Sequence, residues 1–280
     1  WIPRQMSDPL YVADQGEPGA YSEAAALAYF SRSLVMVSCA SFDLVFSAVE
    51  TGGCDYGVVP IENSLAGSIH RNYDLLLRHS LYIVGEYSLN VQHCLIALPG
   101  VELSEIRTVI SHPQALAQCE HHLEALGEIE TLAVHDTAGS VRLVREQGKR
   151  SIAAIASHRA AEVHGMSILI ENFEDEASNF TRFLVIARQP VACTGLAKTS
   201  VVFSLRNQPG SLFKALSVFA LRDIDLTKIE SRPLVGKPWE YLFYVDFSGS
   251  VSDPNVRRAL EHLEEYALML RVLGSYLQYK

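Results

Sequence analysis

The chain has 280 residues, of which 49% are hydrophobic and 20% are charged, and its formal net charge is −9 at pH 7. This length exceeds the usual size of one domain, so we expect two hydrophobic cores. The acidic balance argues against a nucleic-acid partner, because phosphate neutralisation needs clustered Lys and Arg, and no apolar run approaches the roughly 18 residues of a membrane helix.

Apolar runs alternate with helical patterns from residue 10 onward, which is typical of βαβ units with a mostly parallel sheet. The alternation occurs in two rounds, each large enough to form a lobe. The first round predicts strands Leu10–Asp14, Leu34–Cys39 and Tyr56–Ile61, with helices at Tyr21–Phe30, from Ser41, and at Ser68–His79. The second predicts strands Arg107–Ile110, Glu130–Val134 and Ile152–Ala156, with helices at Pro113–Leu126, from Thr137, and at His158–His164.

Two β-rich stretches join these rounds, namely Leu81–Leu98 between them and Ile168–Ile186 after the second. We interpret both as crossings between two lobes that enclose a cleft with a hinge, as in a periplasmic-binding-protein-like α/β fold. The predicted two-lobed domain covers residues 9–188, with lobe 1 at about 9–98 plus 181–188 and lobe 2 at about 99–180.

A short segment with Pro and Gly, residues 189–197, is predicted to be a linker to a second domain at residues 198–280. In that domain strands are expected at Thr199–Leu205, Leu226–Pro233, Trp239–Phe247 and Met269–Tyr276, with helices after Ser211 and after Asp253. The order β, α, β, β, α, β is the α+β ferredoxin-like pattern, which suits a small ligand-sensing module.

Polar residues gather where predicted strands end and helices begin, which is where open α/β sheets bind ligands. The segments are Gln15–Ser22, Pro60–Ser68, Ser111–Gln118 and His135–Ser140, and a fifth, Ala177–Phe183, enters the second crossing. Taken alone, the Gly-rich first segment is better explained as a tight turn. Glu62, Asn63 and Ser64 together exceed what helix capping needs, and this favours a functional role.

Other polar groups have equally good structural explanations. His112 suits either acid–base chemistry or a helix cap, and Asp136 or Thr137 can simply cap the next helix. The segment Cys119–His122 lacks the i, i+4 pairing of an H-E-x-x-H site, so we expect no metal. Because the sequence shows no nucleophile signature, the chemistry is predicted to rely on neutral polar groups.

The five cysteines are scattered, odd in number and without C-x-x-C spacing, which favours a reducing compartment. The first predicted strand starts close to the beginning of the chain and leaves no room for a leader. We therefore expect a cytoplasmic protein, with the plastid stroma as the alternative if a leader was trimmed.

These segments resemble prephenate dehydratases and arogenate dehydratases over about Leu10–Tyr276. The resemblance is carried by Asp14–Gly16, Gly19–Ser22, Pro60–Gly67, Ser111–Gln118, Asp136–Ala138, Ser178–Phe183 with its Thr-Arg-Phe core, and Glu230–Pro233. It implies conversion of prephenate to phenylpyruvate, water and carbon dioxide, no cofactor, and an ACT domain at the C-terminus. Arogenate as substrate remains an alternative, and so does a noncatalytic amino-acid sensor.

By this resemblance, Thr181 is the candidate donor to the departing ring hydroxyl. Threonine is too weak an acid to protonate a leaving group near neutral pH, so we expect a positioned hydrogen bond. Asn63, Ser111, Gln118 and Thr137 are expected to orient the dianionic substrate. Glu62 ranks below them, because a carboxylate beside a dianion is unfavourable. Further substrate-binding candidates are Gln15, Ser64, His112, Arg182 and Phe183.

The resemblance also implies that phenylalanine binds the ACT domain at a subunit interface. The candidate residues are Asn207, Pro209, Gly210, Leu212, Glu230, Ser231, Arg232 and Pro233. Without the resemblance, these segments read as a turn and a charged strand end. The loop Gly210-Ser211-Leu212-Phe213 departs from the usual family pattern, which leaves the sign and strength of regulation open. An interface-bound effector implies a homodimer or homotetramer.

Overall fold

The computed structural model describes residues 9–31, 33–193, 195–234, 236–237 and 239–279. By internal contacts the chain divides into two compact units. The first comprises the described residues up to Tyr73 together with Tyr87–Phe183, and the second comprises Asp74–Glu86 and the described residues from Leu184 onward. Thr194, within the predicted linker, lies outside the described residues. The domain limits expected from the sequence remain predictions.

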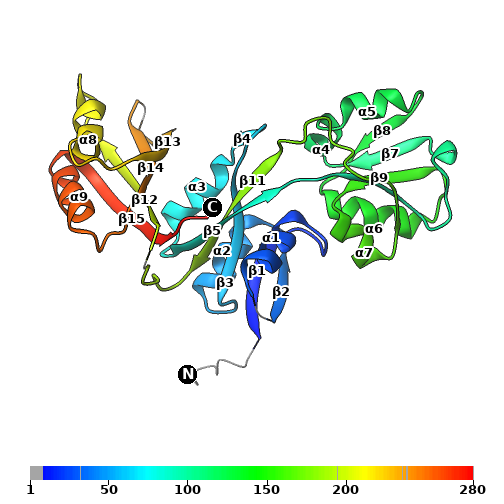
Figure 1. Cartoon of the computed structure of the whole chain (residues 1–280), viewed down its shortest axis with the longest axis horizontal. Coiled ribbons are helices and arrows are strands. Elements are labelled where there is room, and N and C mark those ends of the chain that lie inside the picture. Colours follow the sequence, from blue (N-terminus) through cyan, green and yellow to red (C-terminus); the bar gives the residue numbers. More distant parts are fainter. Residues whose placement is uncertain (1–8, 32, 194, 235, 238, 280) are drawn as a thin grey trace. The chain divides into compact units, whose positions relative to one another are not determined.

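The first sheet has the strand order β2-β1-β3-β11-β5, with a short β4 beside β3 (Figure 1). Strand β1 is parallel to both β2 and β3, as expected for βαβ units. The strands are β1 (Leu10–Gln15), β2 (Leu34–Cys39), β3 (Tyr56–Asn63), β4 (Gly67–Ser68), β5 (Tyr82–Asn90) and β11 (Phe180–Ala187). The accompanying helices are α1 (Tyr21–Tyr29), α2 (Phe42–Glu50) and α3 (His70–Arg78).

The second sheet has the order β10-β6-β9-β7-β8. Its strands are β6 (Cys94–Ala97), β7 (Thr108–Ser111), β8 (Glu130–Ala133), β9 (Ile152–Ala156) and β10 (Ser167–Ile170). Its helices are η1 (Leu103–Glu105), α4 (Pro113–Ala117), α5 (Glu120–Ala125), α6 (Thr137–Gln147) and α7 (His158–His164). Strand β6 pairs with β9 and β10 of this sheet, whereas the boundary expected near residue 98 assigned it to the first lobe.

Strand β9 explains how the second sheet holds its core. Every residue of this strand is buried. Ile152, Ala154 and Ala156 belong to one hydrophobic cluster, while Ala153 and Ile155 belong to another. Because successive side chains of a strand point to opposite faces, β9 supplies both cores at once, and this accounts for its continuous apolar run.

The helix expected over Pro113–Leu126 is interrupted, and α4 and α5 take its place. At the break, the carbonyl of Gln118 accepts a hydrogen bond of 2.8 Å from the amide of Asp175. The Asp175 carboxylate accepts the backbone N–H groups of His121 and His122 at 3.0 and 3.1 Å. A carboxylate from a distant loop therefore caps α5, so local sequence could not indicate the break.

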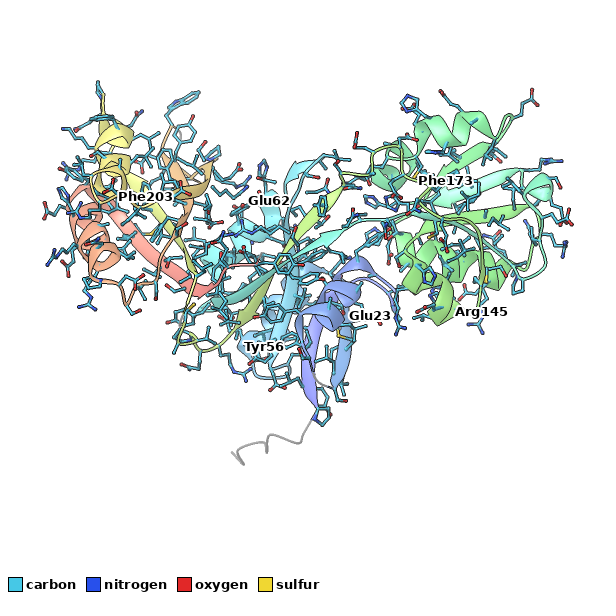
Figure 2. All side chains as sticks on the ribbon, in the orientation of Figure 1. Glu23, Tyr56, Glu62, Arg145, Phe173 and Phe203 are labelled. Carbon is cyan, nitrogen blue, oxygen red and sulfur yellow. The ribbon has the colours of Figure 1, made fainter. Side chains whose placement is uncertain are left out.

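The C-terminal sheet is antiparallel in the order β13-β14-β12-β15. Its strands are β12 (Ala197–Leu205), β13 (Leu226–Pro233), β14 (Tyr241–Ser248) and β15 (Ala267–Leu277), and its helices are α8 (Ser211–Ala220) and α9 (Pro254–Tyr266). Phe203 of β12 is fully buried in the core that both helices cover (Figure 2). The chain order is βαββαβ, so the predicted fold class, two α/β sheets followed by an α+β ferredoxin-like module, is confirmed.

Within the described residues, no helix combines the length and apolar character required to cross a membrane.

The C-terminal part of α3 and the first half of β5 belong to the same compact unit as the C-terminal sheet. Arg271 of β15 donates hydrogen bonds to the carbonyl oxygens of Leu77, His79 and Leu81 at 3.0, 2.7 and 3.1 Å. Carbonyl groups at the end of a helix lack partners within the helix, and a cation there is favourable. Arg271 thus closes the end of α3.

A buried ion pair joins β12 to β5 in this unit. Lys198 Nζ lies 2.6 Å from Glu86 Oε1, and the two side chains are 11% and 3% exposed. The same carboxylate oxygen accepts the backbone N–H of Tyr279 at 3.1 Å. Charges this deeply buried are tolerated only when they are paired and hydrogen-bonded.

We predict that Glu86→Ala lowers the free energy of unfolding by about 3–5 kcal/mol, because it leaves the Lys198 ammonium buried without its partner. The double variant Glu86→Leu/Lys198→Met should recover most of this loss, since it removes both charges. Urea denaturation measures both effects. Glu240→Gln, which breaks an exposed pair with Lys237, is the control and should cost at most about 1 kcal/mol. A double variant as unstable as Glu86→Ala would contradict the prediction.

Candidate functional site

A cavity of about 570 Å³ lies within the first unit and is lined by residues from elements of both of its sheets. The first residues of helices α1, α2 and α6, which are Tyr21, Phe42 and Thr137, line the cavity. The short helix α4 also contributes lining residues. The start of α1 at Ala20 has no side-chain cap. Helix starts present N–H groups and a positive dipole end, so the wall is suited to carboxylates.

The structure brings seven of the predicted site residues together in the lining of this cavity. They are Gln15, Asn63, His112, Gln118, Thr137, Thr181 and Phe183. They come from segments as far apart in the sequence as residues 15 and 183. Their predicted roles are consistent with this position but remain predictions.

Four predicted residues do not line the cavity. Ser111 is fully buried, and its hydroxyl donates to the carbonyl oxygen of Ile155 at 2.6 Å. Glu62 (Figure 2) forms an ion pair of 3.2 Å with Arg182. The Ser64 hydroxyl bridges to the backbone of residues 178 and 180, each at 2.9 Å. The side chains of Ser111, Glu62, Arg182 and Ser64 therefore bond to other protein groups beside the cavity.

The amide of Asn63 organises the centre of the site. Its oxygen accepts the backbone N–H groups of Leu65 and Ala66 at 3.0 and 2.9 Å, which fixes the orientation of the amide. Its nitrogen donates to Thr181 Oγ1 at 3.0 Å and to Asn179 Oδ1 at 2.7 Å. Since Thr181 Oγ1 already accepts a hydrogen bond, the hydroxyl proton can be directed to a molecule in the cavity.

Sequence reasoning missed several of the lining residues. Among the described lining residues, Arg71 carries the one permanent positive charge, and its guanidinium pairs with Asp43. Tyr21 and His93 also line the cavity. Tyr21 lies in a segment that the sequence had marked, but His93 stands in a β-rich crossing without any local motif.

Two histidines of the cavity wall, His93 and His112, favour their neutral forms. Burial lowers the pKa of His93, although its hydrogen bond to Gln118 and the charge of Glu174 oppose this. Burial and the charge of His135 lower the pKa of His112. His112 Nδ1 also accepts the backbone N–H of Gln114 at 3.2 Å, which is the cap that the sequence left as one of two alternatives.

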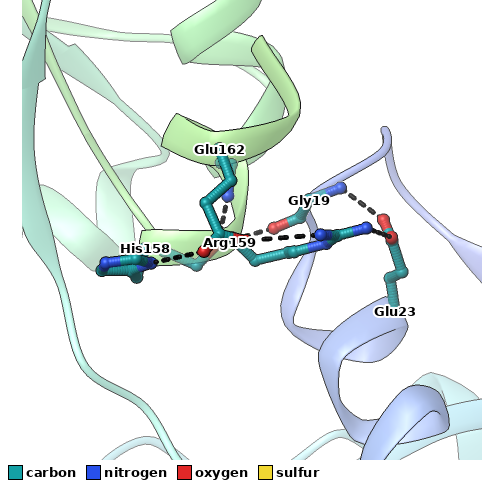
Figure 3. Close-up of polar contacts among 7 residues, drawn as sticks. Gly19, Glu23, His158, Arg159 and Glu162 are labelled. Atoms are coloured by element: carbon teal, nitrogen blue, oxygen red, sulfur yellow. Dashed lines mark hydrogen bonds and ion pairs between the residues drawn. The ribbon is translucent and has the colours of Figure 1, made fainter. Parts of the chain in front are cut away.

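Two ion pairs connect the elements on either side of the cavity. Glu17, in the Gly-rich turn after β1, pairs with Arg142 of α6 through contacts of 2.6 and 2.8 Å. Glu23 of α1 lies 3.4 Å from Arg159 of α7, as Figure 3 shows. Both pairs lie inside one compact unit and hold the Gly-rich turn against the helices of the second sheet.

Gly19 makes the tightest backbone approach in this region. A Cβ placed on it would lie 2.6 Å from the Cα of Ala160, and its φ of +94° is one that other residues rarely adopt. Its carbonyl oxygen accepts a hydrogen bond of 2.6 Å from the Ser157 hydroxyl. The Gly-rich segment is therefore a tight turn, as expected. It also packs against the start of α7.

Asp14, at the end of β1, is a buried carboxyl group behind the cavity. Neither of its oxygens has a hydrogen-bond partner among the described residues, and the nearby Ser22 hydroxyl donates to the carbonyl oxygen of Gln15. Burial, reinforced by the charge of Glu23, raises the pKa of Asp14 to about 7. At pH 7 the folded protein therefore keeps about half of this group neutral, which reduces the negative charge behind the cavity wall.

This shift predicts a pH dependence of stability. Between pH 4 and pH 7 the folded state retains a proton on Asp14 that the unfolded state has lost, so the stability that this group contributes falls as the pH rises through about 7. Relative to wild type, Asp14→Asn should therefore gain roughly 3 kcal/mol in unfolding free energy between pH 5 and pH 8, because about two of these pH units lie below the folded-state pKa of about 7. Denaturation curves of both proteins across this range measure the difference, and a constant difference would contradict the shift.

Among the described residues, no group of three or more His, Cys, Asp or Glu side chains is placed to hold a metal ion. His122, in the segment considered for a metal, instead contacts Asp175 at 2.8 Å.

The predicted effector residues fall into two places of the C-terminal unit. Asn207 and Leu212 line a cavity of about 100 Å³ together with Trp239 and Tyr241. Gly210 precedes α8 with a φ of +79°. The segment Glu230–Pro233 ends β13, and there Arg232 forms an ion pair of 2.8 Å with Asp74 of α3. Pro209 lies in the turn before α8.

Fold and site together define a two-sheet α/β domain with a cavity at several helix starts, followed by an α+β ferredoxin-like module. Comparisons with known proteins agree with this class. The family model for prephenate dehydratase matches residues 12–191, and the model for the ACT domain matches residues 199–265. The chain belongs to the prephenate/arogenate dehydratase family with a C-terminal ACT domain, and it is accordingly a carbon–oxygen lyase.

Individual relatives extend this result. The chain is 52% identical over 276 residues to arogenate dehydratase/prephenate dehydratase 2, chloroplastic, of Arabidopsis thaliana, covering 95% of this chain and 72% of that protein. A crystal structure of prephenate dehydratase from Arthrobacter aurescens in complex with L-Phe is 31% identical, with a TM-score of 0.88 over 96% of this chain and 90% of that one. A structure described as a quorum quenching acylase is 35% identical, with a TM-score of 0.89 over 96% and 98% of the two chains.

Proposed function

We propose that Thr181 assists the departure of the ring hydroxyl during decarboxylative dehydration of the bound substrate. The observation that carries this proposal is the hydrogen bond of 3.0 Å from Asn63 Nδ2 to Thr181 Oγ1. It leaves the Thr181 proton as the one that can point into the cavity. A hydroxyl that already accepts a hydrogen bond is polarised and becomes a better donor.

The reaction breaks two bonds of the substrate ring. The C–C bond to the ring carboxylate breaks, its electron pair enters the ring, and carbon dioxide leaves. The C4–O bond breaks, and the hydroxide takes a proton that solvent ultimately supplies. Aromatisation of the ring provides the driving force. The protein therefore needs to support negative charge developing on the leaving oxygen, which a fixed donor in a shielded site does well.

The remaining lining groups are proposed to hold the substrate carboxylates. Helices α1, α2 and α6 present their N-terminal ends to the cavity, and Arg71 adds a positive charge. Gln15, Gln118 and Thr137 supply neutral polar groups along the same wall. Fixing both carboxylates would orient the ring hydroxyl toward Thr181, and orientation alone can contribute greatly to rate.

We propose that the protein accepts both arogenate and prephenate. The support is the name of the Arabidopsis thaliana relative, which includes both activities, at 52% identity. The two substrates differ in an amino or a keto group on the side chain. Purified protein should form phenylalanine from arogenate and phenylpyruvate from prephenate, and a side-by-side comparison of kcat/KM gives the preference. Failure to consume either substrate would overturn the proposal.

Thr181→Val tests the donor role directly, because valine keeps the shape and removes the hydroxyl. We expect kcat to fall roughly 10²- to 10³-fold, in line with loss of one preorganised donor, with an unchanged circular dichroism spectrum. Thr181→Ser should retain most of the turnover, since it keeps the hydroxyl. Thr131→Val, at an exposed position of β8, is the matched control and should behave as wild type.

The alternative of a noncatalytic sensor predicts a different outcome for the same variants. Under that hypothesis Thr181→Val changes ligand affinity alone, and wild-type protein shows no turnover. Measured turnover in wild type together with loss in Thr181→Val excludes it.

We further propose that phenylalanine regulates the enzyme through the C-terminal unit, in a homodimer or homotetramer. The Arthrobacter aurescens relative was solved with L-Phe, and Asn207 and Leu212 line a small cavity in this unit. Arg232 of the predicted effector segment pairs with Asp74 of α3. The same helix carries Arg71, which lines the catalytic cavity. A shift of α3 on effector binding would thus reach the substrate site.

Asp74→Asn should weaken this coupling. We expect the phenylalanine concentration for a half-maximal effect on rate to change about fivefold or more, whichever the sign of regulation, because coupling between sites is typically worth 5- to 150-fold. Activity without phenylalanine should stay within about twofold of wild type. Glu240→Gln serves as control. An unchanged response in Asp74→Asn would contradict the coupling, and no response of wild type would contradict regulation itself.

The plant relative is named as a chloroplast protein. We therefore propose that this protein is located in the plastid stroma and not in a bacterial cytoplasm.

A further inference from the structure

His93 occupies a buried position between β5 and β6, where the chain passes toward the second sheet. The residue is 2% exposed. Its backbone N–H donates to Glu174 Oε2 at 2.6 Å, and its carbonyl oxygen accepts the N–H of Phe173 at 2.7 Å. Both backbone groups of His93 are thus hydrogen-bonded to the segment of Phe173 and Glu174. These bonds fix the position of the backbone from which the imidazole projects.

The two ring nitrogens of His93 connect two other cavity residues. Nδ1 lies 2.7 Å from the hydroxyl of Tyr21, and Nε2 lies 2.9 Å from Oε1 of Gln118. The Tyr21 hydroxyl is also 2.9 Å from the carbonyl oxygen of Gln92. Tyr21 meets the His93 ring edge-on, with centroids 5.6 Å apart. All of these residues belong to one compact unit.

A neutral imidazole donates from one nitrogen and accepts at the other, so this chain has two self-consistent arrangements. In the first, Tyr21 donates to Nδ1, Nε2–H donates to Gln118 Oε1, and the Gln118 amide directs its NH₂ group elsewhere. In the second, Nδ1–H donates to Tyr21, which donates to Gln92, and the Gln118 amide turns over to donate to Nε2. The His93 tautomer therefore decides which end of the Gln118 amide is left for the cavity.

The contact with Gln118 fits the first arrangement, because Oε1 of Gln118 faces the ring nitrogen. The Tyr21 hydroxyl, which donates to the Gln92 carbonyl in the second arrangement, turns to His93 Nδ1 in the first. The second would place an amide oxygen toward bound carboxylates, which would repel it. Burial lowers the pKa of His93 and so favours the neutral ring on which this choice depends.

We propose that His93 is a positioning residue for the dehydratase reaction, and that its Nε2–H tautomer holds the Gln118 amide with its NH₂ group toward the substrate. The inference rests on the proposed role of Gln118 as a substrate-binding group. It goes further by assigning a function to His93 and Tyr21, and by stating which hydrogen-bond polarity the site requires.

The tautomer can be read without any activity measurement. In protein labelled with ¹⁵N-histidine, the His93 signals should show a protonated Nε2 and an unprotonated Nδ1 near neutral pH, assigned by their loss in His93→Phe. In Tyr21→Phe, which removes the donor to Nδ1, this preference should weaken. A protonated Nδ1 with a bare Nε2 in wild type would overturn the proposal, whatever the outcome for Thr181.

Kinetics test whether the tautomer acts through Gln118. His93→Phe and Gln118→Met should each raise KM and lower kcat/KM roughly 10- to 100-fold, the range for a hydrogen bond to a charged group. The double variant should be no worse than Gln118→Met alone, because His93 has no further effect once the amide is gone. Losses that multiply in the double variant would overturn the proposal. His158→Gln, at an exposed site on α7, is the control.

Should His93→Phe fail to fold, Tyr21→Phe with Gln118→Met provides a second cycle of the same form. If wild-type protein lacked turnover, the proposed function would fail, while the ¹⁵N measurement would still decide the tautomer.

Discussion

The side-chain amide of Asn63 is the interaction on which the catalytic site depends. Through its nitrogen it reaches Asn179 and Thr181 at the start of β11, and through its oxygen it holds the turn that follows β3. One side chain thus joins the end of a parallel strand to the strand that returns from the second sheet. It also sets the hydrogen-bond polarity of Thr181, because an oxygen that accepts from Asn63 has its own proton left to donate. The position of the Thr181 hydroxyl and the direction of its proton therefore both depend on Asn63.

The electrostatics of the cavity follow a consistent scheme. Fixed dipoles and N–H groups at helix starts supply positive potential, and Arg71, which is paired with Asp43, adds a cationic side chain. Negative charge near the wall is neutralised in different ways. Glu17 and Glu62 are paired with arginines, and burial keeps Asp14 about half protonated at neutral pH. Asp136, which also lines the cavity, accepts the backbone N–H of Gly139. A wall of this kind suits the carboxylates of the proposed substrate.

The C-terminal unit shares two elements with the catalytic one, since α3 and β5 each continue from one unit into the other. Several polar side chains of the ACT sheet contact these elements. Arg232 and Arg271 bind α3 and the residues after it, while Lys198 binds Glu86 of β5. These contacts tie α3 and β5 to the C-terminal sheet, and they commit Arg232 to a carboxylate and Arg271 to carbonyl groups.

The sequence by itself determined the elements whose cause is local. Strand and helix periodicity located nearly all elements of both domains, and the polar segments together with the family resemblance identified seven residues that line the cavity. Tertiary structure decided what depends on distant partners. Asp175 interrupts the helix after Pro113, β6 pairs within the second sheet, and Ser111 turns away from the cavity to bond Ile155. His93 carried no local signal, because its role arises from Tyr21 and Gln118, which are 72 and 25 residues away in the chain. Periodicity reports the environment of one segment, whereas hydrogen-bond polarity is set only when separate segments meet.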